Sequence, residues 1–407
     1  MTWAEIAIGD LGRIVTGDTP PRKNPEYYGS AYPFIKPTDM TVGQRLTMTY
    51  EEGYSEDGFA KYRKKLIPAG STAVVTIGSI GQKLTWLHAD CFVNQAVNAV
   101  VPDRAKFDSL YVYYLLKHNL NLVKQADTGA SSGRENVSKS NFSALTVWAC
   151  LDLNTQKQIA EVLDALDSSI EANQRRIALL EEAARRIYRE WFMHLRFPGY
   201  ESVPVKDGVP KGWQTLPLTE CADFINGFAF KPEHQQEVGL PIVKIPELRD
   251  GVGSKTPKNS GVSVPSRNHI DTGDVLFSWS ATLLVNEWSE GPALLNQHLF
   301  KVVPKHPAHK RLIRFAIEAA IPLLLGQSVG ATMQHIRRSA LDGHLMLVPD
   351  GAVTDAFAAL VDPMMDMVLN LQGQNRHLRA TRDSLLPQLM SGHLDVSGIR
   401  LPEEVAA

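Results

Sequence analysis

Residues 158–191 read QIAEVLDALDSSIEANQRRIALLEEAARRIYREW. An apolar seam runs along this stretch in steps that alternate between four and three residues, and its one polar member is an asparagine. The seam consists of Ile159, Leu163, Leu166, Ile170, Asn173, Ile177, Leu180, Ala184, Ile187 and Trp191. A period of 3.5 residues is that of a coiled-coil seam, so the stretch predicts one long helix with a partner along it.

A second stretch near the end of the chain repeats this pattern, again with one asparagine. Its seam consists of Phe357, Val361, Met364, Val368, Leu371, Asn375, Leu378, Arg382, Leu385 and Leu389. Pro363 predicts either a kink or a helix start at Asp362-Pro363. Each stripe could pack on the globular part beside it. The strict spacing favours the two stripes packing on each other, antiparallel because a globular module lies between them, with the asparagines fixing register.

The rest of the chain contains an internal repeat, whose two copies are about 200 residues apart. Asn94-Gln95, five residues and Val101-Pro102 return as Asn296-Gln297, five residues and Val303-Pro304. Three further pairs of segments match in the same order: 33–36 with 241–244, 67–71 with 270–274, and 137–140 with 336–339. This duplication predicts a pseudo-symmetric molecule with two similar surfaces.

Short β-branched and aromatic runs alternate with Gly/Pro turns in both copies, and helices are expected over 109–124 and 310–325. The fold class predicted is α+β, with two pseudo-symmetric domains separated by two long helices that form an antiparallel coiled coil. The predicted order is a first module (1–150), a first helical spacer (151–197), a second module (198–350), a second helical spacer (351–395) and a tail (396–407).

Composition bounds the class of protein. A chain of 407 residues, 44% hydrophobic and 21% charged, fits two globular domains with connectors. No apolar run approaches the length of a membrane span, and the three scattered cysteines predict neither a disulfide framework nor a zinc site, which favours a cytoplasmic location. The net charge of −2 gives a nucleic-acid binder no support. Phosphate binding needs only a local basic face, however.

Motifs for catalysis are weak in this sequence. Asn24-Pro25-Glu26-Tyr27 resembles the Asn-Pro-Pro-Tyr loop of amino-methyltransferases, but Glu26 replaces the second proline and the segment is interpreted as a turn. Residues 251–256 lack the Gly-Lys-Ser/Thr order of a phosphate loop. No acid stands two residues before a lysine, as restriction nucleases usually need, and His306 with His309 has no further ligand nearby. We therefore predict no catalytic residue and no metal site.

Recognition chemistry remains, because amides and guanidinium groups can hydrogen-bond base edges while lysines, hydroxyls and backbone N–H groups bind phosphates. Candidate DNA-binding residues in the first module are Lys36, Gly78, Ser79, Gln82, Lys83, Ser131, Ser132, Arg134, Asn136 and Lys139. Those in the second are Asn226, Lys244, Ser278, Trp279, Ser280, Gln334, Arg337 and Arg338. Taken singly, each of them could equally be part of a solvated loop. Asn94-Gln95 and Asn296-Gln297 could be readers or could satisfy backbone groups inside their modules.

An ordered set of short motifs resembles the specificity subunit of type I restriction–modification enzymes over nearly the whole chain. The motifs are 12–17 (GRIVTG), 19–20 (TP), 24–29 (NPEYYG), 34–39 (FIKPTD), 94–95 (NQ), 156–160 (QKQIA), 191–199 (WFMHLRFPG) and 385–392 (LLPQLMSG). The second helical segment departs from the pattern, because Asp355-Ala356-Phe357 stands where a Gln-Lys-x-Ile counterpart is expected.

This resemblance implies two target-recognition domains that each read one half of a bipartite, asymmetric DNA site, with the coiled coil setting the gap. Such subunits carry no catalytic residues and bind no cofactor. They recruit two modification subunits, which bind S-adenosylmethionine and methylate adenine, and restriction motor-nuclease subunits that use ATP and Mg²⁺. Two alternatives stay open: the recognition part of a separated single-chain restriction–methyltransferase, and a two-domain scaffold or lectin with a dimerising coiled coil.

Overall fold

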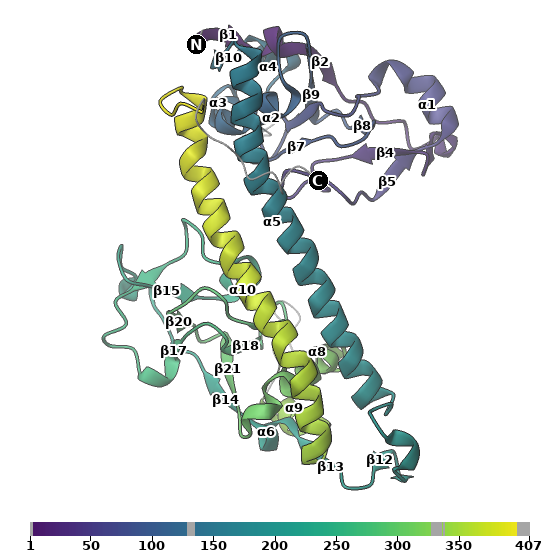
Figure 1. The fold of residues 1–407 in the computed structure, drawn as a ribbon, viewed down its shortest axis with the longest axis vertical. Coiled ribbons are helices and arrows are strands. Elements are labelled where there is room, and N and C mark those ends of the chain that lie inside the picture. Colours follow the sequence, from purple (N-terminus) through teal and green to yellow (C-terminus); the bar gives the residue numbers. More distant parts are fainter. Residues whose placement is uncertain (1–2, 128–134, 327–335, 337, 397–407) are drawn as a thin grey trace. The chain divides into compact units, whose positions relative to one another are not determined.

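The computed structural model describes residues 3–127, 135–326, 336 and 338–396. Its contacts divide the chain into two compact units, Met1–Ile170 with His377–Ala407, and Glu171–Arg376. Both boundaries fall inside the long helices, so each unit holds a globular module and one end of each helix (Figure 1).

The long helices are α5 (Leu153–Tyr188), which continues as a π-helical turn over Arg189–Met193, and α10 (Gly351–Met390). The alternative of a helix start at Asp362-Pro363 is wrong, because α10 begins eleven residues before Asp362 and runs through Pro363. Pro363 lacks the N–H that would bond the carbonyl of Ala359. Ala359 is exposed, so water can solvate that carbonyl and the helix tolerates the proline.

Contacts inside each unit show that the two helices pair antiparallel. In the first unit Asp167 meets Arg382, and Ile159 and Leu163 share a core with Leu386 and Leu389. In the second unit Asn173 hydrogen-bonds Asn375, and the rings of Trp191 and Phe357 lie 5.9 Å apart. The predicted antiparallel coiled coil is confirmed by this pairing.

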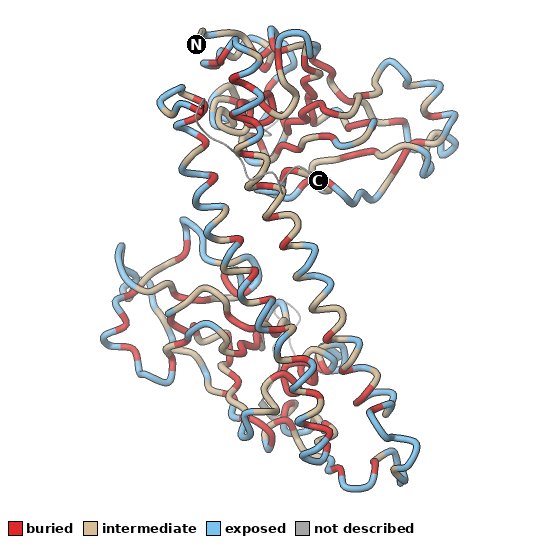
Figure 2. Tube along the Cα trace, viewed as in Figure 1, coloured by how far each residue is buried: buried red, intermediate tan, exposed pale blue. Residues whose placement is uncertain are grey.

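Each helix end also packs on the module of its own unit, as the burial pattern in Figure 2 illustrates. Ile159 and Leu163 join the same core as the buried face of helix α2 (Ser109–His118). Tyr188 and Val361 join the core that contains Phe315 of helix α8 (Lys310–Gly326). The two ways of burying the seams, on each other and on a module, therefore occur together.

The first module contains an antiparallel sheet in the order β2 (Gly12–Thr16), β9 (Val97–Pro102), β6 (Thr72–Val75) and β7 (Leu84–Trp86). A smaller sheet has the order β3 (Tyr28–Gly29), β5 (Glu52–Tyr54), β4 (Tyr32–Ile35) and β8 (Phe92–Val93), in which β4 and β8 run parallel. Strand β1 (Trp3–Ala7) pairs with β10 (Thr146–Cys150). The other helices are α1 (Glu56–Tyr62), α3 (Leu120–Gln125) and α4 (Lys139–Ala144), with short 3-10 turns at Ile8–Leu11, Pro25–Tyr27 and Arg63–Lys65.

The second module repeats this plan. Its main sheet has the order β14 (Ala222–Asn226), β21 (Leu299–Pro304), β18 (Val275–Ser278) and β19 (Val285–Glu287). The smaller sheet has the order β16 (Lys258–Asn259), β15 (Leu240–Val243), β20 (Ala293–Leu295) and β17 (His269–Ile270), again with one parallel pair, β15 and β20. Strand β13 (Gln214–Pro217) pairs with β22 (Leu345–Val348), and β11 (Val205–Lys206) with β12 (Val209–Pro210). The remaining helices are α6 (Leu218–Cys221), α7 (Ile245–Asp250) and α9 (Arg338–Asp342), with 3-10 turns at Tyr200–Ser202, Pro232–His234, Ser266–Asn268 and Pro307–His309.

The helix expected over 310–325 is α8, whereas the one expected over 109–124 breaks in two at Asn119. The Asn119 side chain donates a hydrogen bond to the carbonyl of Leu115 at 2.8 Å, and its backbone leaves the helical region. A side-chain amide that competes for a helix carbonyl is a common cause of such a break.

The two Asn-Gln pairs occupy the same turn in both modules. Asn94 N–H bonds the carbonyl of Ile35 at 3.3 Å, and Asn296 N–H bonds that of Val243 at 3.1 Å. Each asparagine side chain accepts from the backbone two residues on, at Ala96 and His298. The two asparagines therefore satisfy backbone groups inside their modules, whereas the Gln95 side chain is exposed and accepts a hydrogen bond from the Thr19 hydroxyl. In the described part of the chain, no helix has the length and apolar character that a bilayer span requires.

Candidate nucleic-acid interface

In the first module, the turn between β6 and β7 collects several of the candidate residues. Gly78 is exposed at its tip with a φ of +87°, and its N–H bonds the carbonyl of Glu135 at 3.0 Å. Ile77 forms a bridge with Asn136, and Gln82 is exposed on the same turn. The turn and the segment before α4 thus form one surface, which carries the two exposed side-chain amides of Gln82 and Asn136.

Three polar side chains hold the base of this turn. Thr16 donates to the Asn98 carbonyl oxygen at 2.6 Å, and the Asn98 amide donates to the Thr76 hydroxyl at 2.9 Å. Asn98 is only 2% exposed, so these bonds form in the interior and are not weakened by water. At the other end Lys83 donates to the carbonyl of Pro37 at 2.7 Å, which uses its ammonium for holding the turn.

The second module has the equivalent turn between β18 and β19, and it is braced in the same way. The Ile336 N–H bonds the carbonyl of Trp279 at 2.9 Å, just as the Val137 N–H bonds the carbonyl of Thr76 at 2.9 Å. Trp279 is half-buried, and its indole N–H donates to the carbonyl of Gln297 at 3.1 Å.

The two serines of this second turn point inward. Ser278 is fully buried and donates to the carbonyl of Thr282 at 2.7 Å, while Ser280 is 1% exposed and bonds His298 Nδ1 at 3.1 Å. Neither hydroxyl is presented to solvent. The exposed residues of the turn are Ala281 and Thr282, which did not stand out in the sequence because neither has a distinctive polar group for base readout.

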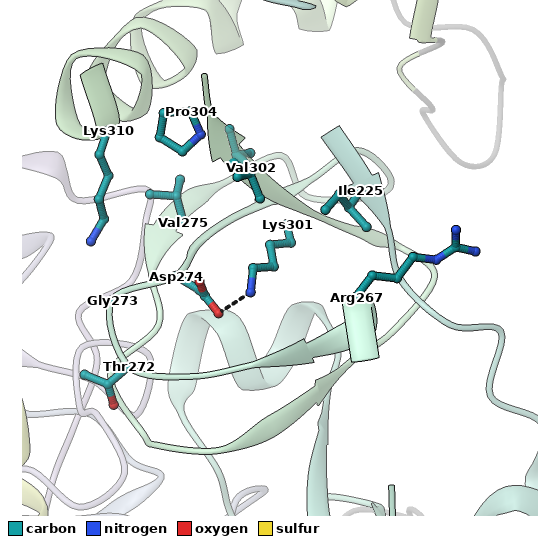
Figure 3. A pocket seen from close by; sticks show the side chains of 11 residues that line it. Ile225, Arg267, Thr272, Gly273, Asp274, Val275, Lys301, Val302, Pro304 and Lys310 are labelled. Carbon is teal, nitrogen blue, oxygen red and sulfur yellow. Dashed lines mark hydrogen bonds and ion pairs between the residues drawn. The ribbon is translucent and has the colours of Figure 1, made fainter. Parts of the chain in front are cut away.

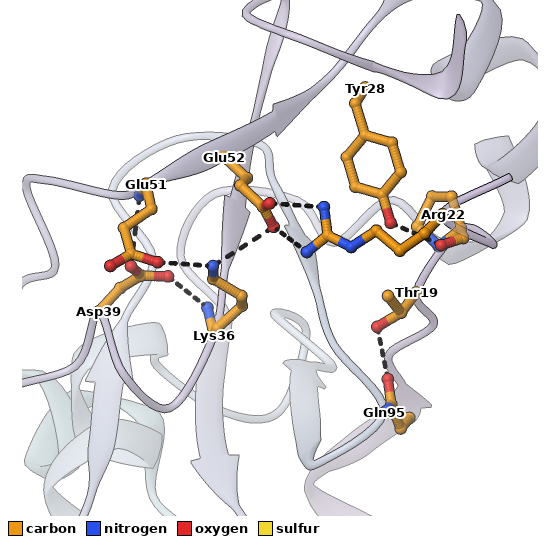
Figure 4. Close-up of polar contacts among 9 residues, drawn as sticks. Thr19, Arg22, Tyr28, Lys36, Asp39, Glu51, Glu52 and Gln95 are labelled. Atoms are coloured by element: carbon orange, nitrogen blue, oxygen red, sulfur yellow. Dashed lines mark hydrogen bonds and ion pairs between the residues drawn. The ribbon is translucent and has the colours of Figure 1, made fainter. Parts of the chain in front are cut away.

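Lys36 lies in a network of ion pairs (Figure 4). Its ammonium binds Glu51 at 2.9 Å and Glu52 at 3.3 Å, and the Glu51 hydrogen bond raises the pKa of Lys36. Arg22 binds the same Glu52 at 2.6 Å. The charge of Lys36 is therefore compensated inside the module. The matching Lys244 is half-buried at the start of α7, and its backbone N–H bonds Glu247 at 3.1 Å.

Asn226 is exposed at the end of β14, where its carbonyl accepts a 2.6 Å hydrogen bond from Asn268. Lys139 is exposed at the start of α4. Five candidates lie outside the described residues: Ser131, Ser132, Arg134, Gln334 and Arg337. Arg338 begins α9, and the description does not extend to its side chain.

A basic run at the end of α1 is absent from the candidate residues predicted from the sequence. Lys61, Arg63 and Lys64 are exposed, and Lys65 is half-buried. The available signal was local charge density, because residues 61–65 hold four cations in five positions.

Two hollows in the described modules lack a catalytic arrangement of side chains. The hollow beside Gly273 has a volume of about 560 Å³, and Lys301 in its lining is ion-paired with Asp274 at 2.8 Å (Figure 3). Lys310, which also lines it, is ion-paired with Glu287 at 3.3 Å. A hollow of about 420 Å³ lies beside the equivalent Gly70. Within the described residues no group of three or more potential ligands could hold a metal ion.

Along the helix pair, all predicted seam residues are buried or half-buried. In α5 and the turn after it they are Ile159, Leu163, Leu166, Ile170, Asn173, Ile177, Leu180, Ala184, Ile187 and Trp191. In α10 they are Phe357, Val361, Met364, Val368, Leu371, Asn375, Leu378, Arg382, Leu385 and Leu389. Asn173 donates to Asn375 at 3.0 Å. In the first unit the buried Asp167 binds Arg382 at 2.5 Å and accepts from Tyr114 at 2.9 Å. The helix pair therefore carries specific polar contacts in both units.

Comparison with known proteins connects this architecture to a family. Residues 1–182 match the model of the type I restriction modification DNA specificity domain. The type I restriction enzyme MjaIX specificity subunit of Methanocaldococcus jannaschii is 24% identical over 97% of this chain and 94% of its own length. The HindI specificity subunit of Haemophilus influenzae is 33% identical over 36% of this chain and 31% of its own. The crystal structure of an S subunit from M. genitalium aligns over 96% of both chains, with 15% identity and a TM-score of 0.61.

Over nearly its whole length the chain is thus similar to type I specificity subunits, and its first 182 residues match the DNA specificity domain. In this chain the glutamine of the 156–160 motif, at the start of the first long helix, holds that helix to the first module. Gln156, the fourth residue of α5, is fully buried and accepts from the N–H of Asp108 at 2.8 Å. Its amide donates to the carbonyls of Lys106 and Cys150 at 3.1 and 2.9 Å. Gln156 thereby ties the first turn of α5 to the first module.

The second long helix, α10, lacks an equivalent connection to its module. Thr354 is the fourth residue of α10 and is 3% exposed. Within the described structure its hydroxyl has no hydrogen-bond partner. The sequence departs from the family motif at Asp355-Ala356-Phe357. Thr354, just before it, has a shorter side chain than a glutamine and does not bond the module backbone.

Proposed function

We propose that the two modules of this non-catalytic specificity subunit each read one half of a bipartite, asymmetric DNA site. The observation that carries the proposal is the duplicated exposed turn, after β6 in one module and after β18 in the other. Each is braced by the segment before α4 or α9. Two similar surfaces on one chain suit a target with two parts.

The chemistry of the first turn fits a base-reading element. Gly78 has no neighbouring atom within 4 Å of the place of a Cβ, so the backbone is open to close approach. Gln82 and Asn136 bring amides that can bond base edges, and Lys139 brings a cation for a phosphate. In the second module the exposed Asn226, Ala281 and Thr282 are the side chains that a base can reach.

The helix pair is proposed to set the number of unread bases between the half-sites and to dock two modification subunits. S-adenosylmethionine, ATP and Mg²⁺ would then belong to the modification and restriction subunits. A chain with this role acts on DNA in the cytoplasm.

Methylome sequencing of the host, with and without the gene, tests the function. We expect one bipartite adenine-methylation motif to disappear on deletion and to return on complementation. A methylome that does not change, together with no salt-dependent affinity of the assembled complex for DNA, would leave the scaffold or lectin alternative as the better explanation.

A spacer of defined length can be tested by an insertion. Four residues added to α5 after Asn173 lengthen a helix by about 6 Å at ~1.5 Å per residue. We expect the unread gap to grow by roughly one to two base pairs, at ~3.4 Å per base pair, with both half-sites unchanged. The control replaces the exposed Arg175, Arg176, Ala178 and Leu179 without changing the length. An unaltered gap in a methylation-protection assay would refute the role of the helices.

A further inference from the structure

The basic run of the first module, residues 61–65, is displayed on a structured element. Helix α1 is capped by Ser55, whose hydroxyl accepts from the N–H of Gly58 at 3.0 Å, and a 3-10 turn over Arg63–Lys65 follows it. Lys61, Arg63 and Lys64 are exposed, and no ion pair holds any of them within the described residues.

An aromatic cluster fixes this element to the module. Tyr62, in the middle of the run, packs edge-on against Tyr54 at 5.7 Å. Tyr54 stacks on Phe92 at 4.1 Å and donates to the carbonyl of Asp18 at 3.0 Å. Tyr54 is fully buried, so the cations stand on a rigid support and lose little conformational freedom of the backbone when they bind.

Hydrogen bonds connect the run to the base of the proposed reading turn. Lys65 donates to the carbonyl of Thr16 at 3.1 Å. The Thr16 hydroxyl bonds Asn98, and Asn98 bonds Thr76, the residue at which the exposed turn after β6 begins. The basic run and the turn therefore belong to the same edge of the sheet, where β2 and β6 end and β9 begins.

The second module has no equivalent of this run. Its segment between β16 and β17, residues 260–268, holds one cation, Arg267, and no helix of the kind of α1. The two modules therefore differ in charge at this equivalent segment, although they share the same fold.

We propose that Lys61, Arg63 and Lys64 bind phosphates of the duplex beside the half-site read by the first module, while Lys65 holds the run to the sheet. This makes the first module the stronger electrostatic anchor of the two. The inference rests on the proposed function. Contacts of this kind carry no base information: they raise affinity and position the protein on DNA, and they release counterions, which makes binding dependent on salt.

The test uses the full chain assembled with its modification subunits and a duplex that carries the methylation site mapped in the host. Binding is measured from about 50 to about 200 mM KCl. We expect the K61Q/R63Q/K64Q variant to flatten the slope of log affinity against log salt by ~0.9 for each phosphate that the variant no longer neutralises, about 2.7 for three. The methylated sequence should stay the same.

Two control variants separate a local effect from removal of charge in general. K61R/K64R keeps the cations and should keep the slope. K206Q/K211Q/K305Q removes as many charges from exposed positions of the second module and should leave the slope nearly unchanged. The inference is overturned if K61Q/R63Q/K64Q leaves the salt slope unchanged or alters the methylated sequence. It is also overturned if K206Q/K211Q/K305Q flattens the slope by the same amount. If the unmodified complex has no affinity for the duplex, the proposed function itself fails.

Discussion

At the tips of the two equivalent turns, two different residues take the same left-handed backbone conformation. Gly78 has a φ of +87°, and Ala281, at the same place after β18, has a φ of +56°. A residue with a Cβ is disfavoured there by about 1–2 kcal/mol, whereas glycine adopts the conformation freely. The second turn is therefore strained where the first is relaxed.

Substitutions at these tips should have opposite effects on stability. A281G should stabilise the chain and G78A should destabilise it, by about 1 kcal/mol each after the larger chain entropy of glycine is included. Urea unfolding of the full chain measures both changes. A281S, which keeps the Cβ, is the control and should change little. A destabilising A281G would show that the left-handed strain does not govern this turn.

The fourth residues of the two long helices offer a second comparison. Q156L removes three hydrogen bonds made by a fully buried side chain, one of them buried and two partly buried, so it should cost about 2–4 kcal/mol. T354V replaces a buried hydroxyl that has no hydrogen-bond partner within the described structure, and it should be neutral or slightly stabilising. Thermal unfolding followed by circular dichroism distinguishes the two. Equal decreases in stability for both variants would contradict the proposed difference between the helix starts.

At the scale of elements, the paired helices combine apolar burial with a few buried polar contacts. Asn173 and Asn375 are 7% and 3% exposed and bond each other. Such a pair lowers stability relative to leucines, but it penalises shifted registers because a shifted amide would be buried without a partner.

A double-mutant cycle measures this coupling. N173L and N375L should each destabilise the helix pair, because each removes the hydrogen bond between the two buried amides. The N173L/N375L double variant should recover stability and reach or exceed that of the parent. We expect an interaction energy of about 1 kcal/mol or more from thermal unfolding. Strictly additive effects would mean that the hydrogen bond does not connect the two positions energetically.

At the scale of the whole molecule, each module is joined to its helix ends by ion pairs as well as by its core. In the second unit Arg311 of α8 binds Asp366 of α10 at 2.6 Å, and Arg185 of α5 binds Glu318 of α8 at 2.8 Å. A module taken from another specificity subunit must therefore match these partners to fold on the same helices.

Replacing residues 205–350 with the module of another specificity subunit should change one half-site of the methylated motif and leave the other half-site and the gap unchanged. The chimaera should retain Arg311, Glu318 and Phe315 or their equivalents, so that the contacts to α5 and α10 persist. Methylome sequencing reads out both halves at once. A change in both half-sites would disprove independent reading by the modules.

Residue order alone specified the two long helices, their antiparallel pairing, the duplicated α+β plan and the family, because periodicity and repeats can be read without any knowledge of distant contacts. It did not specify which polar loop residues face water. Ser278 and Ser280 looked like Gln82 in the sequence, yet both hydroxyls are buried while Gln82 is exposed. Lys36 looked available, yet it is held by Glu51 and Glu52.

These points depended on the folded arrangement, because burial and ion pairing involve residues distant in the chain. The fold also connected Lys65 through Thr16 and Asn98 to Thr76, four residues that are spread over the sequence of the first module. Solvent exposure also explains why α10 starts well before Pro363. The carbonyl that the proline leaves without an N–H partner lies where water reaches it.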